Sequence, residues 1–219
     1  SPAPVLEARE LYRFHHTDDD EIFALRGVSL SVVPGEILAV TGPSGSGKST
    51  LLACLAGLDQ PDGGHVIVGG TRVSRRDEVA RAELRARHIG FLFQTGNLFD
   101  HLDLADNLRL VRRLAGRPPG DVTSLLSELG LADRAHARPS TLSGGEAARA
   151  GLAVALANDP AVVLADEPTG ELDRTSEATV IGLLRTRAEQ GIAIVIATHS
   201  AQVAAAADRE IRLQDGAIA

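Results

Sequence analysis

The 219-residue chain lacks methionine and tryptophan, and it has one cysteine and one tyrosine. A single cysteine, Cys54, excludes a disulfide framework within the chain and fits a reducing compartment. Apolar runs are also short: residues 192–197 form one of the longest, and none approaches the ~18 residues that span a bilayer. Residues 1–10 have neither a basic start nor an apolar stretch, so we expect no secretory signal there.

Basic residues are too few for a general nucleic-acid binder. The chain has 22 basic and 29 acidic residues and a formal net charge of −7. A nucleic-acid binder needs a basic face that displaces counterions from phosphates. Hydrophobic residues make up 44% of the chain, which is ordinary globular composition. A chain of 219 residues is long enough to bury most of its unfolded surface, so we expect a globular protein that needs no disulfide or metal to hold its core.

Lysine is nearly absent, and its one occurrence is informative. Of the 22 basic residues only Lys48 is a lysine. It lies in residues 42–49, which match the pattern G-x-x-x-x-G-K-[ST] between an apolar strand, residues 37–40, and a helix predicted over residues 48–58. A structural glycine turn is the alternative, but this context favours a phosphate-binding loop.

Each residue type in this loop suits phosphate. Glycines let backbone N–H groups turn inward, and the helix N-terminus adds unpaired donors and partial positive charge. Lys48 can reach the β- and γ-phosphates, and the Ser49 hydroxyl can bind Mg²⁺. The predicted phosphate-binding residues are Gly42, Pro43, Ser44, Gly45, Ser46, Gly47, Lys48, Ser49 and Thr50.

Two carboxylates end a later apolar segment, residues 161–165. A buried strand that ends in Asp166 and Glu167 is costly unless the charges meet a cation or another partner. We expect Asp166 to hold Mg²⁺ through water, and Glu167 to orient or deprotonate a water near the γ-phosphate. Two solvated residues at a strand end are the alternative, and the upstream phosphate loop makes it the weaker one.

A further glycine-rich segment, residues 142–146, opens a helix predicted to end near residue 158. Ser143 and Glu146 have the spacing of a capping box, so a well-capped helix is expected. Gly144 and Gly145 leave backbone amides bare for a second anion. The helix predicted over residues 78–87 is rich in arginine, and we expect its charges to form a solvated face.

These segments occur in one order along the chain: the Lys48 loop, Gln94, residues 142–146, the Asp166–Glu167 pair and His199. In this order the chain resembles the ATP-binding cassette (ABC) ATPases over essentially its whole length. The resemblance implies an α/β P-loop NTPase (RecA-like) core with a mainly parallel sheet, an N-terminal antiparallel β subdomain and an inserted helical subdomain. It implies a single domain, residues 1–219, with the core in 1–94 and 158–219 and the helical subdomain in 95–157.

The resemblance also implies roles for individual residues. Lys48, Gln94, Glu167 and His199 are the expected catalytic residues of an ATPase that uses ATP and Mg²⁺. Ser49, Gln94 and Asp166 are the expected Mg²⁺ ligands, and His15 occupies the position that stacks on adenine, with Phe14 as an open alternative. Ser143, Gly144, Gly145 and Asp173 are expected to reach the ATP held by a second copy, so that ATP binding forms a head-to-tail homodimer around two ATP molecules.

A partner in the membrane is implied as well. Glu146 stands where glutamine is commoner, as in the lipoprotein-release, macrolide-export and cell-division group, and residues 93–99 resemble the coupling region of that group. The expected partner is an integral membrane permease, which places the chain in the cytoplasm at the inner face of the cell membrane. The alternative within the group is a cell-division ATPase that transmits force without transport. A soluble cassette acting on DNA or ribosomes would carry a coiled-coil insertion or a second cassette, and a P-loop kinase would not need residues 143–145 or His199.

Overall fold

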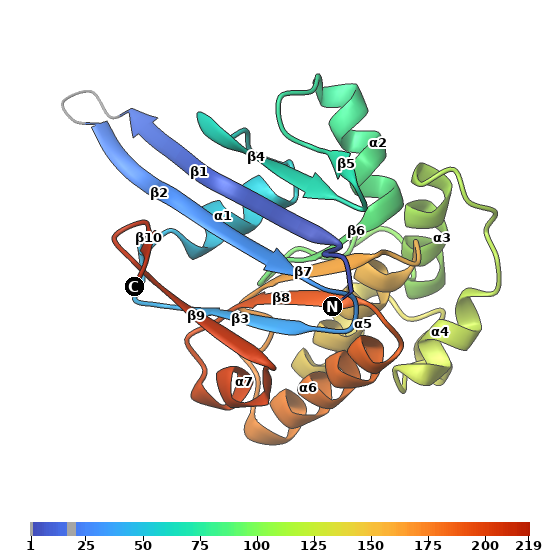
Figure 1. Ribbon diagram of the computed structural model, residues 1–219. Helices are drawn as coiled ribbons and strands as arrows, with labels where there is room; N and C mark the ends of the chain where they lie inside the picture. The colour runs from blue at the N-terminus through green and yellow to red at the C-terminus, as the bar shows by residue number, and fades with distance from the viewer. Residues whose placement is uncertain (1, 17–20) are drawn as a thin grey trace.

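The computed structural model describes residues 2–16 and 21–219, without the side chains of residues 15, 16, 21 and 22 (Figure 1). Its first sheet is antiparallel, with the strand order β2-β1-β4-β5. The strands are β1 (Leu6–His16), β2 (Glu21–Val32), β4 (Gly63–Val68) and β5 (Thr71–Arg72). The N-terminal antiparallel part of the fold prediction is confirmed by this sheet.

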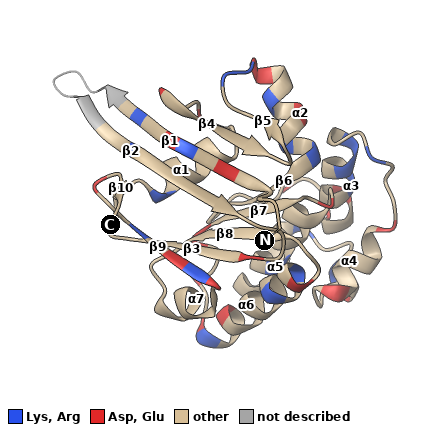
Figure 2. Cartoon of the chain, in the orientation of Figure 1, with Lys and Arg blue, Asp and Glu red and all other residues tan. Residues whose placement is uncertain are grey.

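The second sheet has six strands in the order β10-β9-β3-β8-β7-β6. All neighbours pair in parallel except β10, which turns back on β9. Neither β3 nor β8, in the middle of the sheet, contains a charged residue (Figure 2). Its strands are β3 (Ile37–Thr41), β6 (Ile89–Leu92), β7 (Val162–Asp166), β8 (Ala193–Ala197), β9 (Arg209–Gln214) and β10 (Ala217–Ile218). Apolar parallel strands need cover on both faces, which the helices provide.

The α-helices are α1 (Lys48–Leu55), α2 (Glu78–His88), α3 (Leu104–Leu114), α4 (Val122–Glu128), α5 (Gly144–Leu156), α6 (Arg174–Glu189) and α7 (Ala201–Ala206). Two 3₁₀ turns, Ala132–Arg134 and Pro139–Thr141, lie between α4 and α5. An Asp or Ser side chain caps the N-terminus of each helix from α2 to α7. Within the described residues, α1 is the α-helix without such a cap, so its first N–H groups stay available to a ligand.

Side-chain alternation along the parallel strands divides the core into two layers. Leu38 and Val195 face a cluster that contains α1 and the antiparallel sheet. Ile37, Val163 and Ile194 face the opposite way, toward α3 to α6. Successive residues of a strand point to opposite faces, so a continuous apolar run fills both layers at once.

The edge of the parallel sheet extends further than the sequence indicated. β9 pairs with β3, and β10 pairs with β9, both after residue 197, where no strand was predicted. β9 is polar, with the charged residues Arg209, Glu210 and Arg212. Its alternation of polar and apolar residues is short, which makes it a weak strand signal in the sequence. No helix of residues 2–16 and 21–219 is long and apolar enough to cross a membrane.

Candidate active site

The loop between β3 and α1 bends through three glycines with positive φ: Gly42 at 146°, Gly45 at 78° and Gly47 at 102°. A Cβ at Gly42 would collide with the carbonyl oxygen of Leu213, and one at Gly47 with that of Ala24. In the described part of the chain, a Cβ at Gly45 would meet no atom within 4 Å, so there is room for a ligand beside this residue. The loop therefore requires glycine for its bends and for its close packing against the neighbouring backbone.

Hydrogen-bond donors of this loop are available to a negatively charged ligand. Lys48 Nζ donates to the carbonyl oxygens of Gly42 at 2.9 Å and Pro43 at 3.1 Å, which holds the ammonium across the loop. Ser46 is 3% exposed, and its buried Oγ has no hydrogen-bond partner among the residues that the structure describes. Together with the uncapped N-terminus of α1, these donors fit a phosphate group.

A cavity of about 570 Å³ opens at this loop. It is lined by Phe23, Ala24, Ser44, Gly45, Gly47, Lys48, Ser49, Thr50, Gln94, Asp166, Glu167 and His199. The structure therefore brings together Lys48, Ser49, Gln94, Asp166, Glu167 and His199, which are more than 150 residues apart at the extremes of the chain. Each of them lies at or after the carboxyl end of a parallel strand, where ligands of open α/β sheets bind.

Asp166, the last residue of β7, is a partly desolvated carboxylate. Burial raises its pKa above the ordinary value, the Glu167 charge adds to the rise, and a hydrogen bond with Ser49 and the Lys48 charge oppose it. A bound cation would relieve this desolvated charge. The described residues contain no group of three His, Cys, Asp or Glu side chains that could hold a metal by themselves. The oxygen donors at this cavity, Ser49 and Asp166, are of the kind that Mg²⁺ takes together with substrate phosphates.

Glu167 occupies a strained backbone conformation, with φ at 47°. Its N–H donates to the carbonyl oxygen of Ala197 at 2.9 Å, and its own carbonyl accepts from Gly170 N–H at 3.2 Å. Its carboxylate meets His199, whose Nδ1 lies 2.9 Å from Oε1. Strain of this kind persists where the surroundings hold it, and here it falls on a residue that lines the cavity.

Four predicted nucleotide-binding residues do not line this cavity. Ser143 caps α5 in the predicted capping box, accepting from Glu146 N–H at 3.3 Å. Asp173 caps α6 through bonds from the Thr175 and Ser176 N–H groups at 2.9 and 3.0 Å. Gly144 lines a separate cavity of about 310 Å³, which Gln94 and Glu167 also border. Ser143, Gly144 and Asp173 are exposed, and Gly145 is half-buried.

Residues 42, 43 and 46 also stay out of the cavity lining. Gly42 and Pro43 contribute the carbonyl oxygens that accept hydrogen bonds from Lys48. Ser46 contributes a buried hydroxyl. His15 lies in β1 opposite Ile22, but its side chain is outside the part of the chain that the structure describes, so its predicted adenine contact stays a prediction.

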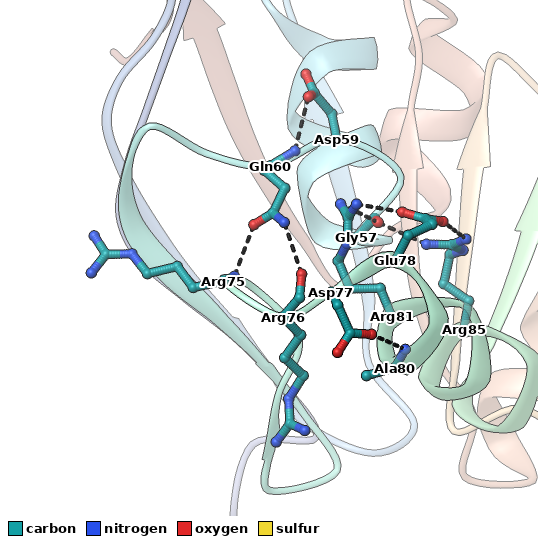
Figure 3. A network of polar contacts seen from close by, with 10 residues as sticks. All are labelled: Gly57, Asp59, Gln60, Arg75, Arg76, Asp77, Glu78, Ala80, Arg81 and Arg85. Carbon is teal, nitrogen blue, oxygen red and sulfur yellow. Dashed lines mark hydrogen bonds and ion pairs between the residues drawn. The ribbon is translucent and has the colours of Figure 1, made fainter.

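Arginines of α2 hold the far end of α1, which sequence reasoning missed (Figure 3). Arg85 Nη1 donates to the Gly57 carbonyl at 2.8 Å and Arg81 Nη1 to the same oxygen at 3.2 Å, while Glu78 accepts from both side chains. The expectation of a solvated arginine face is wrong for these two, whose side chains are 11% and 21% exposed. Cations at a helix C-terminus stabilise the helix dipole.

The fold and the site define a P-loop nucleoside triphosphatase: a parallel sheet, a glycine-bent loop with a lysine, and an Asp-Glu pair at the same cavity. Residues 25–170 match the family model described as ABC transporter. The chain belongs to this family, and it is an ATP-binding ABC ATPase subunit.

Individual relatives agree with this assignment. The chain is 41% identical to an uncharacterized ABC transporter ATP-binding protein of Thermotoga maritima over 98% of this chain and 93% of that protein. It is 43% identical to the lipoprotein-releasing system ATP-binding protein LolD of Maricaulis maris, over 97% and 95%. It is 44% identical to the macrolide export ATP-binding/permease protein MacB of Burkholderia cenocepacia over 98% of this chain, but it spans only 32% of that protein.

A solved structure agrees as well. The dimeric bacterial ABC transporter cassette MJ0796 superposes with a TM-score of 0.90 at 32% identity, covering 97% of this chain and 96% of that one. A second structure of the same cassette is a dimer in a post-hydrolysis state with ADP and Pi, with the same TM-score, identity and coverage. The predicted fold class and ATPase activity are confirmed by these likenesses.

Proposed function

We propose that the 570 Å³ cavity binds ATP with Mg²⁺, and that the site hydrolyses ATP by transferring the γ-phosphate to water with ADP as the leaving group. The observation that carries this proposal is the convergence of the only lysine, Lys48, with Asp166 and Glu167 in one cavity. Lys48 and the N–H groups at the start of α1 hold the β- and γ-phosphates. Ser49, Asp166 and Gln94 hold Mg²⁺, which when bound neutralises charge on the phosphate oxygens.

Glu167 and His199 complete the site. The Glu167 carboxylate accepts a proton from the attacking water or orients it, and His199 lies within hydrogen-bond distance of that carboxylate. The His199 side chain is 69% exposed, so a γ-phosphate in the cavity can reach the ring while Nδ1 contacts Glu167. Gln94 lies two residues past the end of β6 and lines both the 570 Å³ and the 310 Å³ cavities. A bound nucleotide can therefore affect the second cavity through this side chain.

A second copy of the chain supplies the remaining contacts. Ser143, Gly144, Gly145 and Asp173 lie outside the ATP cavity, three of them exposed, which suits residues that contact ATP on another molecule. The similar MJ0796 cassette is a dimer. We place these four residues against the γ-phosphate and the partner cassette in a head-to-tail homodimer that holds two ATP molecules.

An integral membrane permease is the proposed partner, which places the chain at the inner face of the cell membrane. An apolar groove of about 350 Å³ is lined by Leu58, Phe93 and Leu114, which are 43%, 43% and 69% exposed. Leu58 and Phe93 belong to the proposed core and Leu114 to the proposed helical subdomain, residues 95–157. A cytoplasmic helix of a permease fits such a groove, and the similar MacB proteins are by name ATP-binding/permease proteins. Nucleic acid is not a proposed partner, because the net charge is −7.

The proposal is tested by measuring ATP hydrolysis with Mg²⁺ and with a chelator, for the chain alone and together with the membrane protein that copurifies with it. Hydrolysis that needs Mg²⁺, and that depends on the copurified protein, supports it. Full activity with the chelator would overturn the Mg²⁺ assignment. Movement of a substrate across reconstituted vesicles separates transport from the cell-division alternative, in which ATP is hydrolysed without transport.

A further inference from the structure

One carboxylate of α6 bonds to the loops that follow two neighbouring parallel strands. Glu177 lies in the first turn of α6, and its Oε1 accepts hydrogen bonds from Ser200 Oγ at 2.7 Å and from Thr169 Oγ1 at 3.2 Å. Thr169 comes two residues after Glu167, and Ser200 directly follows His199. A single oxygen atom therefore joins the two loops that carry the proposed catalytic pair.

The Ser200 hydroxyl is fixed in its orientation. Its oxygen accepts from the Val203 N–H at 3.3 Å as the N-cap of α7, and its one proton goes to the Glu177 carboxylate. The Ser200 N–H donates to Thr198 Oγ1 at 3.0 Å. Thr198 is buried, and its own N–H donates to a β3 carbonyl at 3.0 Å. His199 therefore stands between one residue held by the sheet and one held by Glu177.

Thr169 belongs to the turn that follows Glu167. It is 5% exposed, and its carbonyl accepts from the Leu172 N–H at 3.0 Å, while the Glu167 carbonyl accepts from the Gly170 N–H at 3.2 Å. Because Glu167 has a positive φ, its backbone conformation depends on the contacts around it. The bond from Thr169 Oγ1 to Glu177 is one of those contacts, and it ties the turn to α6.

A glutamate in the first turn of a helix also stabilises the positive N-terminal end of the helix dipole. That role depends on the charge and needs no particular partner. The two hydroxyl bonds of Glu177, by contrast, need an acceptor atom at one position, and both donors belong to loops outside α6. The two roles therefore separate when the charge is removed and the oxygen is kept, as in glutamine.

We infer that Glu177 is a positioning residue of the ATPase, which holds Glu167 and His199 at the geometry that water attack on the γ-phosphate requires. Within the described part of the chain Glu177 does not line the 570 Å³ cavity, so it acts through Thr169 and Ser200. Loss of its oxygen frees both loops at once, and a displacement of about 1 Å at a catalytic group can cost roughly 10²-fold in rate. The inference rests on the proposed ATP hydrolysis at this cavity.

The test measures steady-state ATP hydrolysis and equilibrium ATP binding of the whole chain with Mg²⁺, alone and with the membrane protein that copurifies with it. Glu177→Ala is expected to lower kcat by roughly 10- to 100-fold and to change KM and ATP affinity by less than about twofold, because the phosphate loop is untouched. Glu177→Gln keeps an acceptor oxygen and is expected to stay within about threefold of the parent kcat. Glu189→Ala removes an exposed carboxylate at the end of the same helix and should leave kcat and KM unchanged.

Thr169→Val gives an independent check, since valine keeps the shape of threonine and removes the hydroxyl. It is expected to lower kcat by roughly 2- to 10-fold, the size of one hydrogen bond. The double variant Thr169→Val with Glu177→Ala is expected to be no slower than Glu177→Ala, because both changes remove the same contact. Additive losses would mean that the two residues act separately, and they would overturn the inference.

Other results would overturn the inference while the proposed function stands. Parent-like kcat in Glu177→Ala means that the two loops hold the catalytic pair without this carboxylate. Equal losses in Glu177→Gln and Glu177→Ala mean that the charge at the helix N-terminus matters, and not the hydroxyl bonds. Loss of ATP affinity in step with kcat means that Glu177 supports the fold in general. If the parent hydrolyses no ATP, or if Glu167→Gln keeps the parent rate, the proposed function itself fails.

Discussion

His199 Nδ1 lies 2.9 Å from Glu167 Oε1, and the His199 backbone N–H lies 3.3 Å from Oε2 of the same carboxylate. The two residues follow neighbouring parallel strands, β7 and β8. Both oxygens of the proposed catalytic carboxylate are therefore held by one residue at the sheet edge. Both residues line the cavity that contains Lys48.

Glu167→Gln is expected to slow ATP hydrolysis by roughly 10²- to 10⁴-fold, the usual cost of losing a general base, without weakening ATP binding. ATP-bound dimers should then accumulate, because the bound state is no longer consumed. The rate of phosphate release measures the first effect. Size-exclusion chromatography in the presence of ATP measures the fraction of dimer. Glu171→Gln, at an exposed carboxylate four residues on, is the matched control and should behave like the parent. Parent-rate turnover in Glu167→Gln would remove Glu167 from the catalytic role.

Lys48→Ala is expected to weaken ATP binding by roughly 10- to 100-fold, because one hydrogen bond to a charged group contributes about 1.5–3 kcal/mol. Lys48→Arg is expected to fail as a substitute, since a planar guanidinium is wider than an ammonium and Lys48 is only 9% exposed within the loop. Titration calorimetry with Mg-ATP checks both variants. Unchanged affinity in Lys48→Ala would show that the loop is not the phosphate site.

Arg85→Ala is expected to lower the free energy of unfolding by about 1–2 kcal/mol, since it removes the bond to the Gly57 carbonyl and a charge at the C-terminus of α1. Chemical denaturation measures the change. Arg87→Ala is the matched control, because Arg87 is exposed on the same helix and should cost little. Equal losses in the two variants would indicate a general effect on α2 instead of a specific effect on α1.

Cys54 should make stability depend on pH only in alkaline solution. Burial raises the pKa of its thiol from 9.0 to about 12, and the nearby Asp59 charge adds to the rise. Above pH 9.0 the unfolded chain therefore loses this proton before the native chain does, so stability falls as pH rises from about 9 toward 12.

The comparison that tests this is the unfolding free energy of the parent and of Cys54→Ala between pH 7 and pH 11. The loss attributed to the thiol should be present in the parent and missing from the variant. A parallel pH dependence in both chains would mean that the thiol ionises equally in the native and unfolded states.

Several elements were predictable because their signals are local. The glycine pattern of residues 42–49 predicts a bent loop, and the structure has positive φ at Gly42, Gly45 and Gly47. The spacing of Ser143 and Glu146 predicts a capping box, and both of its bonds are present. By contrast, β9, which lies between β10 and β3, is a polar strand with little periodicity to read. The partial burial of Arg81 and Arg85 depends on their contact with the Gly57 carbonyl, which is distant in the sequence.

The amino-acid sequence alone determined the loop chemistry, the apolar strands and the order of the motifs, since these depend on neighbours in the chain and on side-chain type. Tertiary structure alone decided which of those groups share a cavity. Lys48, Glu167, His199 and Phe23 line one cavity only because the strands are arranged as they are. Ser143 and Asp173 do not line that cavity. Strand order and pairing set these distances, and no local pattern records them.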